Sequence, residues 1–238
     1  MGTVAVVGTG LIGGSLGLAL RRAGHRVQGY DADADRLSRA LARGAVDEAA
    51  PSLADAYTGA DAAFVAVTVS GVADAVAAAL DAGVGAVSDV GSVKGPVVRA
   101  VEARAGGAAA RFVGGHPMAG SAGEEGIEGA DADLFVGAAW VLTPTADSDP
   151  AAFTTVRDLV AVTGAKVMAI EPELHDELVA IVSHLPHLAA SAVMHLAADA
   201  QPNHETLLRL AAGGFRALTR LSGRSAGIWP DICVENRA

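Results

Sequence analysis

The feature that most constrains the fold is a glycine-rich turn near the N-terminus. A short apolar run, Val4-Ala5-Val6-Val7, leads directly into Gly8-Thr9-Gly10-Leu11-Ile12-Gly13, and an alanine- and leucine-rich helical stretch follows as far as Arg22. In a strand, turn and helix of this kind, Gly8 permits the tight turn, Gly10 lets the backbone approach a pyrophosphate, and Gly13 lets helix and strand pack closely. Main-chain N–H groups at the start of the helix face the anion. The stretch predicts a dinucleotide site with Gly8, Gly10, Leu11, Ile12 and Gly13 as cofactor contacts.

An aspartate follows the next predicted strand. Residues 26–30 read as a strand that ends at Asp31, about twenty residues beyond the glycines, as the dinucleotide fingerprint requires. Its carboxylate can accept hydrogen bonds from ribose hydroxyls and would repel a 2′-phosphate, which favours NAD over NADP. The alternative is a loop aspartate that caps the helix beginning near Asp33.

Helices and strands then alternate as far as residue 170. We expect helices at residues 36–43, 52–57, 72–80 and 150–163, and strands at residues 62–67, 86–90, 138–144 and 166–170. Continuous apolar strands such as residues 63–67 indicate a parallel sheet covered on both faces. After residue 171 the pattern is helical throughout. The expected domains are an NAD-binding domain at residues 1–170 and a helical domain at residues 171–238, whose roles in substrate binding and dimerisation are implied only by the family resemblance described below.

One histidine stands at a predicted strand end. In open parallel sheets ligands bind beyond the carboxyl ends of the strands, and Gly114-Gly115-His116-Pro117 occupies such an end. The flanking glycines offer backbone room for a ligand. An imidazole with an ordinary pKa of about 6.5 is suited to take a hydroxyl proton while hydride leaves the same carbon. The alternative for His116 is a hydrogen bond to a neighbouring carbonyl group.

A second strand end carries Ser92 and Lys94, within the segment at residues 89–96. Either side chain could hydrogen-bond the histidine, the nicotinamide ribose or the substrate. The alternative is that Ser92 caps the next helix and that Lys94 is solvated.

Histidines recur in the helical tail. His184 and His187 are three residues apart and share one helix face, with Pro186 between them freeing the carbonyl of Val182. Without a nearby carboxylate or thiolate ligand this pair does not predict a metal site. Hydrogen bonding to a polar substrate and a role as satisfied core histidines both remain open.

Arginines recur every fourth residue further on, at Arg216, Arg220 and Arg224. Such a row is either a solvated helix face or a source of a planar clamp for a ligand carboxylate.

Charge and composition exclude several functions. Seventeen basic and 27 acidic residues give a formal net charge of -10, which opposes binding to nucleic acid or to anionic membranes. Residues 178–198 are apolar enough to raise the question of a membrane span, but histidines and a proline there are costly in lipid. We therefore expect a helix buried in protein on most sides. The single Cys233 and an N-terminus without a signal-peptide pattern predict a cytoplasmic protein.

Taken together, these motifs are familiar. The sequence resembles the prephenate/arogenate dehydrogenase family of tyrosine biosynthesis over nearly its full length. The resemblance is carried by the glycine turn, Asp89-Val90-Gly91-Ser92-Val93-Lys94, Gly115-His116-Pro117-Met118-Ala119-Gly120, Ser183-His184-Leu185-Pro186-His187, Gly214-Phe215-Arg216, Thr219-Arg220 and Trp229-Pro230-Asp231-Ile232.

The resemblance implies an α/β fold, with an N-terminal Rossmann-like, mainly parallel sheet and a C-terminal all-helical domain. The implied activity is NAD-dependent oxidative decarboxylation of prephenate, arogenate or both, giving 4-hydroxyphenylpyruvate or tyrosine, in a homodimer. His116 matches the family histidine that polarises the ring hydroxyl, and Ser92 a serine near that histidine and the nicotinamide. Arg220 matches the arginine that binds the substrate carboxylate, and His187 a histidine of the substrate pocket. His184, Ser121 and Arg216 are further expected substrate contacts.

The sequence also departs from the family pattern. Ser121-Ala122 replaces a hydroxyl and glutamate pair, Ala217 replaces a frequent acid, and the helical domain is expected to be shortened. Two rival functions follow from the same features. One is another NAD-dependent two-domain dehydrogenase or imine reductase, and the other is a non-catalytic, dimeric NAD-binding sensor.

Overall fold

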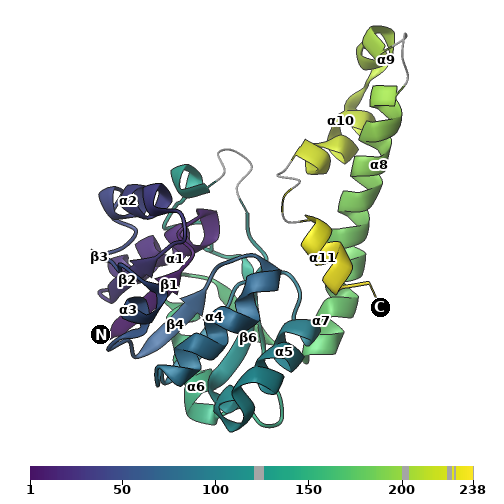
Figure 1. Ribbon diagram of the computed structural model, residues 1–238. Helices are drawn as coiled ribbons and strands as arrows, with labels where there is room; N and C mark the ends of the chain where they lie inside the picture. Colours follow the sequence, from purple (N-terminus) through teal and green to yellow (C-terminus); the bar gives the residue numbers. More distant parts are fainter. Residues whose placement is uncertain (121–125, 200–203, 224–226, 228, 238) are drawn as a thin grey trace. The chain divides into compact units, whose positions relative to one another are not determined.

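The computed structural model describes residues 1–120, 126–199, 204–223, 227 and 229–237 (Figure 1). The chain divides into two compact units, Met1–His175 and Asp176–Ala238. The strands of the first unit are β1 (Thr3–Val7), β2 (Arg26–Tyr30), β3 (Glu48–Ala49), β4 (Ala62–Val65), β5 (Ala86–Asp89), β6 (Phe112–Pro117), β7 (Ala139–Thr143) and β8 (Lys166–Ala169).

Helices connect these strands. They are α1 (Leu11–Arg22), α2 (Ala34–Ala42), α3 (Leu53–Tyr57), α4 (Val69–Asp81), α5 (Gly95–Ala105) and α6 (Pro150–Ala161), with the 3-10 turns η1 (Gly106–Arg111) and η2 (Gly126–Gly129). The helices that follow are α7 (Pro172–Val179), η3 (Ala180–His184), α8 (Leu185–Asp199), α9 (His204–Leu210), α10 (Gly213–Thr219), η4 (Arg220–Gly223) and α11 (Trp229–Glu235).

The strands form one eight-stranded sheet in the order β3-β2-β1-β4-β5-β6-β7-β8. Every neighbouring pair is parallel except β6 and β7, which are antiparallel. The first six strands have the order 3-2-1-4-5-6 of the dinucleotide-binding fold, in which the strand order reverses beside β1. The expected Rossmann-like, mainly parallel sheet with a helical C-terminal region is therefore confirmed.

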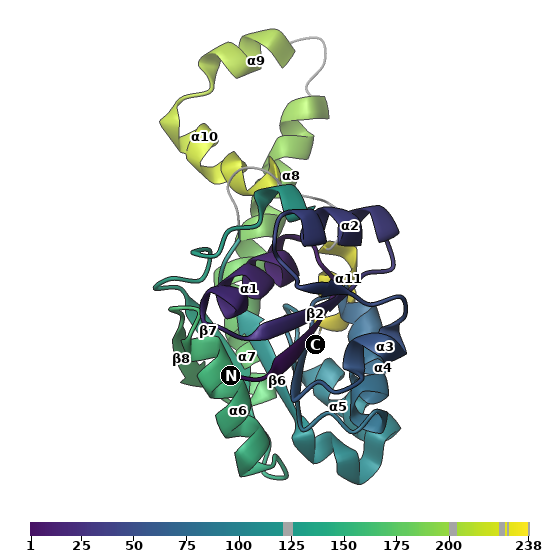
Figure 2. The same ribbon diagram turned by 90° about the vertical axis from the view of Figure 1, so that its left-hand side faces the viewer.

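The central strands β1 and β4 are buried on both faces because they are apolar at nearly every position. Along β1, Val4 and Val6 enter a core that α1 and α6 cover. Ala5 and Val7 point to the opposite face, where α3, α4 and α5 complete a second core. Figure 2 shows the strands between these two helical layers. The layers leave the ends of the strands as the places where polar groups can gather.

The apolar stretch in the C-terminal helices differs from the expectation. Pro172–Asp199 is long and apolar enough to cross a membrane by length and composition, yet only 22% of its most apolar window is buried within the chain. Ile181 and Val182 are each 66% exposed and Leu185 is 61% exposed. The prediction of a helix buried on most sides is thus wrong for the single chain, because these large side chains point away from its own core.

Pro186 has the local effect that its position implies. The chain forms a π-helical turn at Ala180–His184, immediately before α8. Proline lacks the N–H of a regular helical bond and its ring displaces the carbonyl four residues earlier, and such defects are commonly accommodated by an extra residue in one turn. The helical path therefore continues past Pro186 with its regular hydrogen bonding interrupted there.

Candidate active site

In the glycine turn between β1 and α1, an added side chain would collide with the protein at two glycines and would meet open space at a third. Gly8 has φ +89°, and a Cβ there would lie 2.3 Å from the carbonyl oxygen of Ala66. A Cβ on Gly13 would lie 1.8 Å from the carbonyl oxygen of Gly8. At Gly10 an added Cβ would meet nothing within 4 Å. Gly8 and Gly13 are thus required by the fold itself, whereas Gly10 leaves space beside the backbone where a ligand can approach.

The start of α1 faces this space. Gly10 is the N-cap and no side chain caps the helix; its carbonyl accepts the first helical bond, from Gly14, at 2.8 Å. The N–H groups of Leu11 and Ile12 belong to the first turn, which lacks intrahelical acceptors in any α-helix. Together with the positive end of the helix dipole, they form an environment that favours a phosphate group.

Asp31 is fixed beside the same turn. Its Oδ2 accepts hydrogen bonds from the Thr9 main-chain N–H at 2.7 Å and from the Thr9 hydroxyl at 3.1 Å. The Arg36 guanidinium pairs with its Oδ1 at 3.1 Å. Sequence reasoning missed both partners, although Thr9 lies inside the glycine motif and Arg36 lies in the first turn of α2. The carboxylate therefore stands, buried and oriented, next to the predicted cofactor turn.

The alternative prediction, that Asp31 caps the next helix, is wrong because another aspartate caps it. Asp33 caps α2, and its side chain accepts from the main-chain N–H groups of Asp35 and Arg36. The hydrogen bond from Arg36 is the main reason that the pKa of Asp33 is lowered, and it outweighs desolvation, which acts in the opposite direction.

His116 lies on β6, buried, opposite Val141 of β7. Its Nδ1 is 2.9 Å from Nε2 of His175, and the two rings meet edge to face with centroids 5.1 Å apart. His175 is fully buried and comes from the first turn of α7, 59 residues further along the chain. Sequence reasoning did not find His175, because nothing local distinguishes it from other helix histidines.

A buried ion pair holds the backbone beside His116. Lys94 and Asp89 are both fully buried and paired with each other. Asp89 Oδ1 accepts from the Gly115 N–H at 3.0 Å, while Lys94 Nζ donates to the Gly115 carbonyl at 2.8 Å. β5 ends at Asp89, so these two side chains supply Gly115 with the hydrogen bonds that a longer β5 would have provided. The alternative of a solvated lysine is wrong.

Closely packed neighbouring atoms explain the glycines before His116. A Cβ on Gly114 would lie 2.4 Å from Thr143 Oγ1 and 3.3 Å from Lys94 Cδ, and one on Gly115 would lie 2.6 Å from the Asp89 carbonyl oxygen. The expectation that these glycines make room for a ligand is therefore corrected: protein atoms fill the space.

Ser92 lies half-buried in the loop between β5 and α5, at the carboxyl edge of the sheet. The N-cap of α5 is Lys94, without a side-chain cap, so the helix-capping alternative for Ser92 is wrong. Among the described residues the structure records no hydrogen bond from the Ser92 hydroxyl to His116.

The second unit gathers the two tail histidines around one aromatic ring. His187 stacks on Trp229 with ring centroids 3.5 Å apart and planes 7° from parallel. His184 meets the same ring edge to face at 6.0 Å, and its Nδ1 is 3.2 Å from the Asn236 amide. Both histidines are buried, which agrees with the expected shared face.

The two predicted arginines among the described residues of the second unit are exposed, unlike the buried histidines. Arg216 on α10 and Arg220 at the start of η4 are exposed. Within residues 204–223 and the other described parts of the chain, neither forms an ion pair with an acid. The two guanidinium groups lie four residues apart on the exposed surface of the second unit. Ser121 falls outside the described residues.

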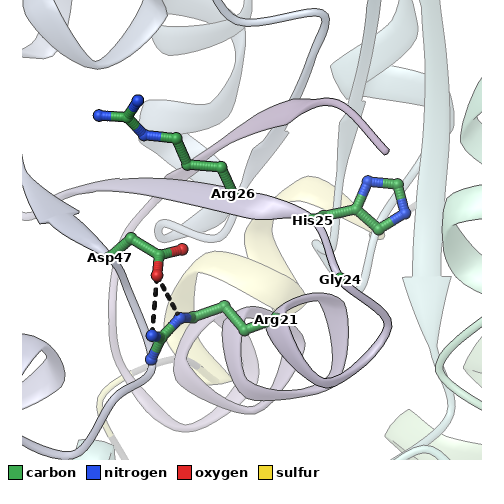
Figure 3. Close-up of a pocket in the computed structure, with 5 residues that line it drawn as sticks. All are labelled: Arg21, Gly24, His25, Arg26 and Asp47. Atoms are coloured by element: carbon green, nitrogen blue, oxygen red, sulfur yellow. Dashed lines mark hydrogen bonds and ion pairs between the residues drawn. The ribbon is translucent and has the colours of Figure 1, made fainter.

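One surface depression lies away from all of these groups. Arg21, Gly24, His25, Arg26 and Asp47 line it, at the end of α1 and the start of β2 (Figure 3). That is the amino edge of the sheet, opposite to the strand ends that carry Asp31 and His116. Arg21 and Asp47 pair with each other across it at 2.7 Å, so its charges are largely satisfied internally.

The topology, the open position at Gly10 and the oriented Asp31 define a dinucleotide-binding α/β protein followed by a helical unit. A family model described as prephenate dehydrogenase, nucleotide-binding domain, matches residues 16–169, and one described as prephenate dehydrogenase, dimerization domain, matches residues 171–238. The chain belongs to the prephenate dehydrogenase family.

Individual relatives agree with this assignment. Prephenate dehydrogenase of Bacillus subtilis is 32% identical over 244 residues, covering 99% of this chain and 64% of its own length, so the chain spans less than two thirds of that relative. A crystal structure of prephenate dehydrogenase from Aquifex aeolicus, in complex with hydroxyphenyl propionate and NAD+, is similar with a TM-score of 0.89 at 32% identity, covering 100% of this chain and 83% of that one. Synechocystis arogenate dehydrogenase is similar with a TM-score of 0.81 at 32% identity, covering 99% and 84%.

Proposed function

We propose that the protein is an NAD-dependent oxidoreductase that oxidatively decarboxylates prephenate, arogenate or both. The observation that carries the proposal is the pairing of His116 with His175 at the carboxyl edge of the sheet that also bears the glycine turn. Family membership supports the reaction class, because the relatives are prephenate and arogenate dehydrogenases. The proposal retains the cytoplasmic location predicted from composition.

The residues of the first unit fit NAD. Gly10 leaves space for a pyrophosphate, and the uncapped start of α1 favours its negative charge. The Asp31 carboxylate is suited to accept hydrogen bonds from ribose hydroxyls and to disfavour a 2′-phosphate. When bound, the nicotinamide supplies the hydride acceptor that the reaction needs. Ser92, at the same edge of the sheet, is proposed to contact this ring or the substrate.

His116 carries the proton chemistry in this proposal. His175 contacts Nδ1 of His116. We therefore assign to the other ring nitrogen of His116, Nε2, the role of accepting the proton of the substrate hydroxyl. As hydride leaves the ring carbon that bears the hydroxyl, His116 takes that proton. The bond to the ring carboxylate breaks, CO₂ leaves, and the bonding electrons complete the aromatic ring. His116 then returns the proton to the ring oxygen, so the step involves no net proton release.

The proposed substrate contacts in the second unit are Arg220, Arg216, His187 and His184, with Ser121 as a further contact. The exposure of the two arginines supports carboxylate binding, since an accessible planar guanidinium can donate two parallel hydrogen bonds. Arg220→Ala should raise KM for the acid by the loss of about 1.5 to 3 kcal/mol, roughly 10- to 150-fold, with a smaller effect on kcat. An unchanged KM would return Arg220 to the role of a solvated helix residue.

The proposal includes a homodimer. The large exposed side chains of α8 and the preceding turn form an apolar face that a second copy of the chain can cover. The match of residues 171–238 to a dimerization domain favours that occupant over others. Sedimentation of the purified protein measures the mass directly, and a monomer at micromolar concentration would contradict this part of the proposal.

One steady-state experiment tests the activity. The purified full chain is mixed with NAD and either prephenate or arogenate, and NADH absorbance is followed, with NADP as the parallel cofactor. We expect NADH formation with at least one acid, and its loss in His116→Asn with NAD binding retained. Absence of turnover with both acids, alongside normal NAD binding, would favour the non-catalytic sensor. Full activity of His116→Asn would refute the role of His116.

A further inference from the structure

The strongest unassigned feature is the second histidine of the buried pair. His175 is fully buried, its Nε2 is 2.9 Å from Nδ1 of His116, and the ring planes are 71° apart. Its main chain is fixed as well, because the His175 N–H donates to the Glu171 carbonyl at 2.9 Å in the first turn of α7. Because His175 is fixed against His116, the contact limits which ring nitrogen of each histidine can carry a hydrogen.

The contact allows two proton arrangements with opposite consequences. A neutral imidazole carries one N–H, on either Nδ1 or Nε2. If His116 carries its hydrogen on Nδ1 and donates it to His175, its Nε2 has a lone pair and can accept a proton. If His175 donates instead, His116 carries its hydrogen on Nε2 and can only donate there. Only the first arrangement provides a base.

We propose that His175 is a positioning residue that accepts the Nδ1–H of His116 and thereby keeps His116 in the tautomer whose Nε2 is the base. The contact itself is given by the geometry, whereas the direction of its hydrogen bond is inferred from the need for a base at Nε2 and so rests on the proposed function. His175 has the role that an orienting third group has beside the base of a nucleophile–base pair, with a neutral ring in place of a carboxylate.

One further observation and one chemical argument support this role. The backbone before His116 is already fixed, because Asp89 and Lys94 hold both polar groups of Gly115. The contact with His175 holds the His116 ring about its side-chain bonds as well. When His116 takes a proton, its Nδ1–H becomes a charge-assisted donor to His175, so the contact strengthens as the reaction proceeds.

The kinetic test compares two substitutions at one position. His175→Phe keeps a ring of similar size and removes the acceptor, whereas His175→Gln places an amide oxygen near the position of Nε2. We expect His175→Phe to lower kcat between about 10- and 10⁴-fold, the upper limit being the whole contribution of a general base, with KM for the acid changed less than about threefold. His175→Gln should recover most of kcat. His25→Gln, at the amino edge of the sheet, is the matched control and should leave kcat unchanged.

The spectroscopic test needs neither substrate nor cofactor. In the full chain labelled with ¹⁵N-histidine, long-range nitrogen–proton correlations distinguish an Nδ1–H ring from an Nε2–H ring, and His116→Asn identifies the His116 signals. We expect Nδ1–H at His116 in the wild type and a change in that pattern in His175→Phe. An Nε2–H at His116, or a His175→Phe variant with full kcat, would overturn the proposal. If no acid is oxidised, the proposed function fails, while the tautomer measurement still decides the role of His175.

Discussion

Removing the charge of Lys94 tests whether the buried ion pair is as important as its position indicates. Lys94→Met keeps the length of the side chain and deletes the ammonium, leaving the fully buried Asp89 without its cation. Breaking a buried pair by removing one partner typically costs about 3 to 5 kcal/mol. Asp89 retains the N–H groups of Gly91 at 2.9 Å and Gly115 at 3.0 Å, which argues for the low end, about 3 kcal/mol.

For a chain of 238 residues, a loss of that size corresponds to a fall of roughly 6 to 12 °C in thermal midpoint. Denaturant unfolding of the variant and the wild type, at constant pH and salt, measures the free energy directly. Lys166→Met, at an exposed position on β8, is the matched control and should change stability by less than about 0.5 kcal/mol. The double variant Asp89→Asn/Lys94→Met, which buries no charge, should recover part of the loss. If Lys94→Met is no less stable than Lys166→Met, the argument about this pair is wrong.

Three other predictions concern the glycine turn and the two aspartates near it. Gly13→Ala should destabilise the fold by about 1 to 3 kcal/mol or more, since its Cβ would lie 1.8 Å from a carbonyl oxygen. Gly10→Ala, at φ -72° and in open space, should leave the thermal midpoint unchanged and weaken NAD binding. Equal stability of the two variants in a melting experiment would contradict this contrast. Asp31→Asn should raise the affinity for NADP relative to NAD by at least about tenfold in paired titrations, because bringing the Asp31 carboxylate close to the 2′-phosphate costs on the order of several kcal/mol. An unchanged ratio of the two affinities would argue that Asp31 does not contact the ribose. Because the pKa of Asp33 is lowered in the folded state, its contribution to stability is complete above the ordinary value of 3.8 and is lost as pH falls through the lowered one. Asp33→Asn should therefore melt below the wild type at pH 7, and the difference in thermal midpoint should narrow as the pH falls below 3.8. A difference that does not change with pH would contradict the charge argument.

The parts of the fold that sequence alone predicted are those whose cause is local. Val4 to Val7 alternate between two cores, and the glycine turn that follows has closed and open positions where the fingerprint expects them. The strand at Glu48–Ala49 was not predicted, because two residues are too few to show a period. The antiparallel pairing of β6 with β7 also has no signal in either strand, since direction is decided by the path of the connecting chain.

The site was predicted less completely than the fold, and the reason is tertiary. His116 and Asp31 were found because each ends a strand, and strand ends gather at one edge of a parallel sheet. His175 reaches His116 from 59 residues away, which no local pattern reveals. Lys94 was weighed as a solvated side chain, as lysines usually are, and its burial depends on the gap where β5 stops and β6 continues.

The pair of Lys94 and Asp89 also bears on how the chain reaches its fold. The two residues are five positions apart, so the loop that brings them together is short and its closure costs little entropy. Their charges can therefore neutralise each other while water still surrounds them, before Gly115 and the rest of β6 close over the strand. An ion pair drawn from distant parts of the chain would have to lose its hydration at a late step. Two buried charges carried by one short loop can therefore enter the interior together, as one neutral unit.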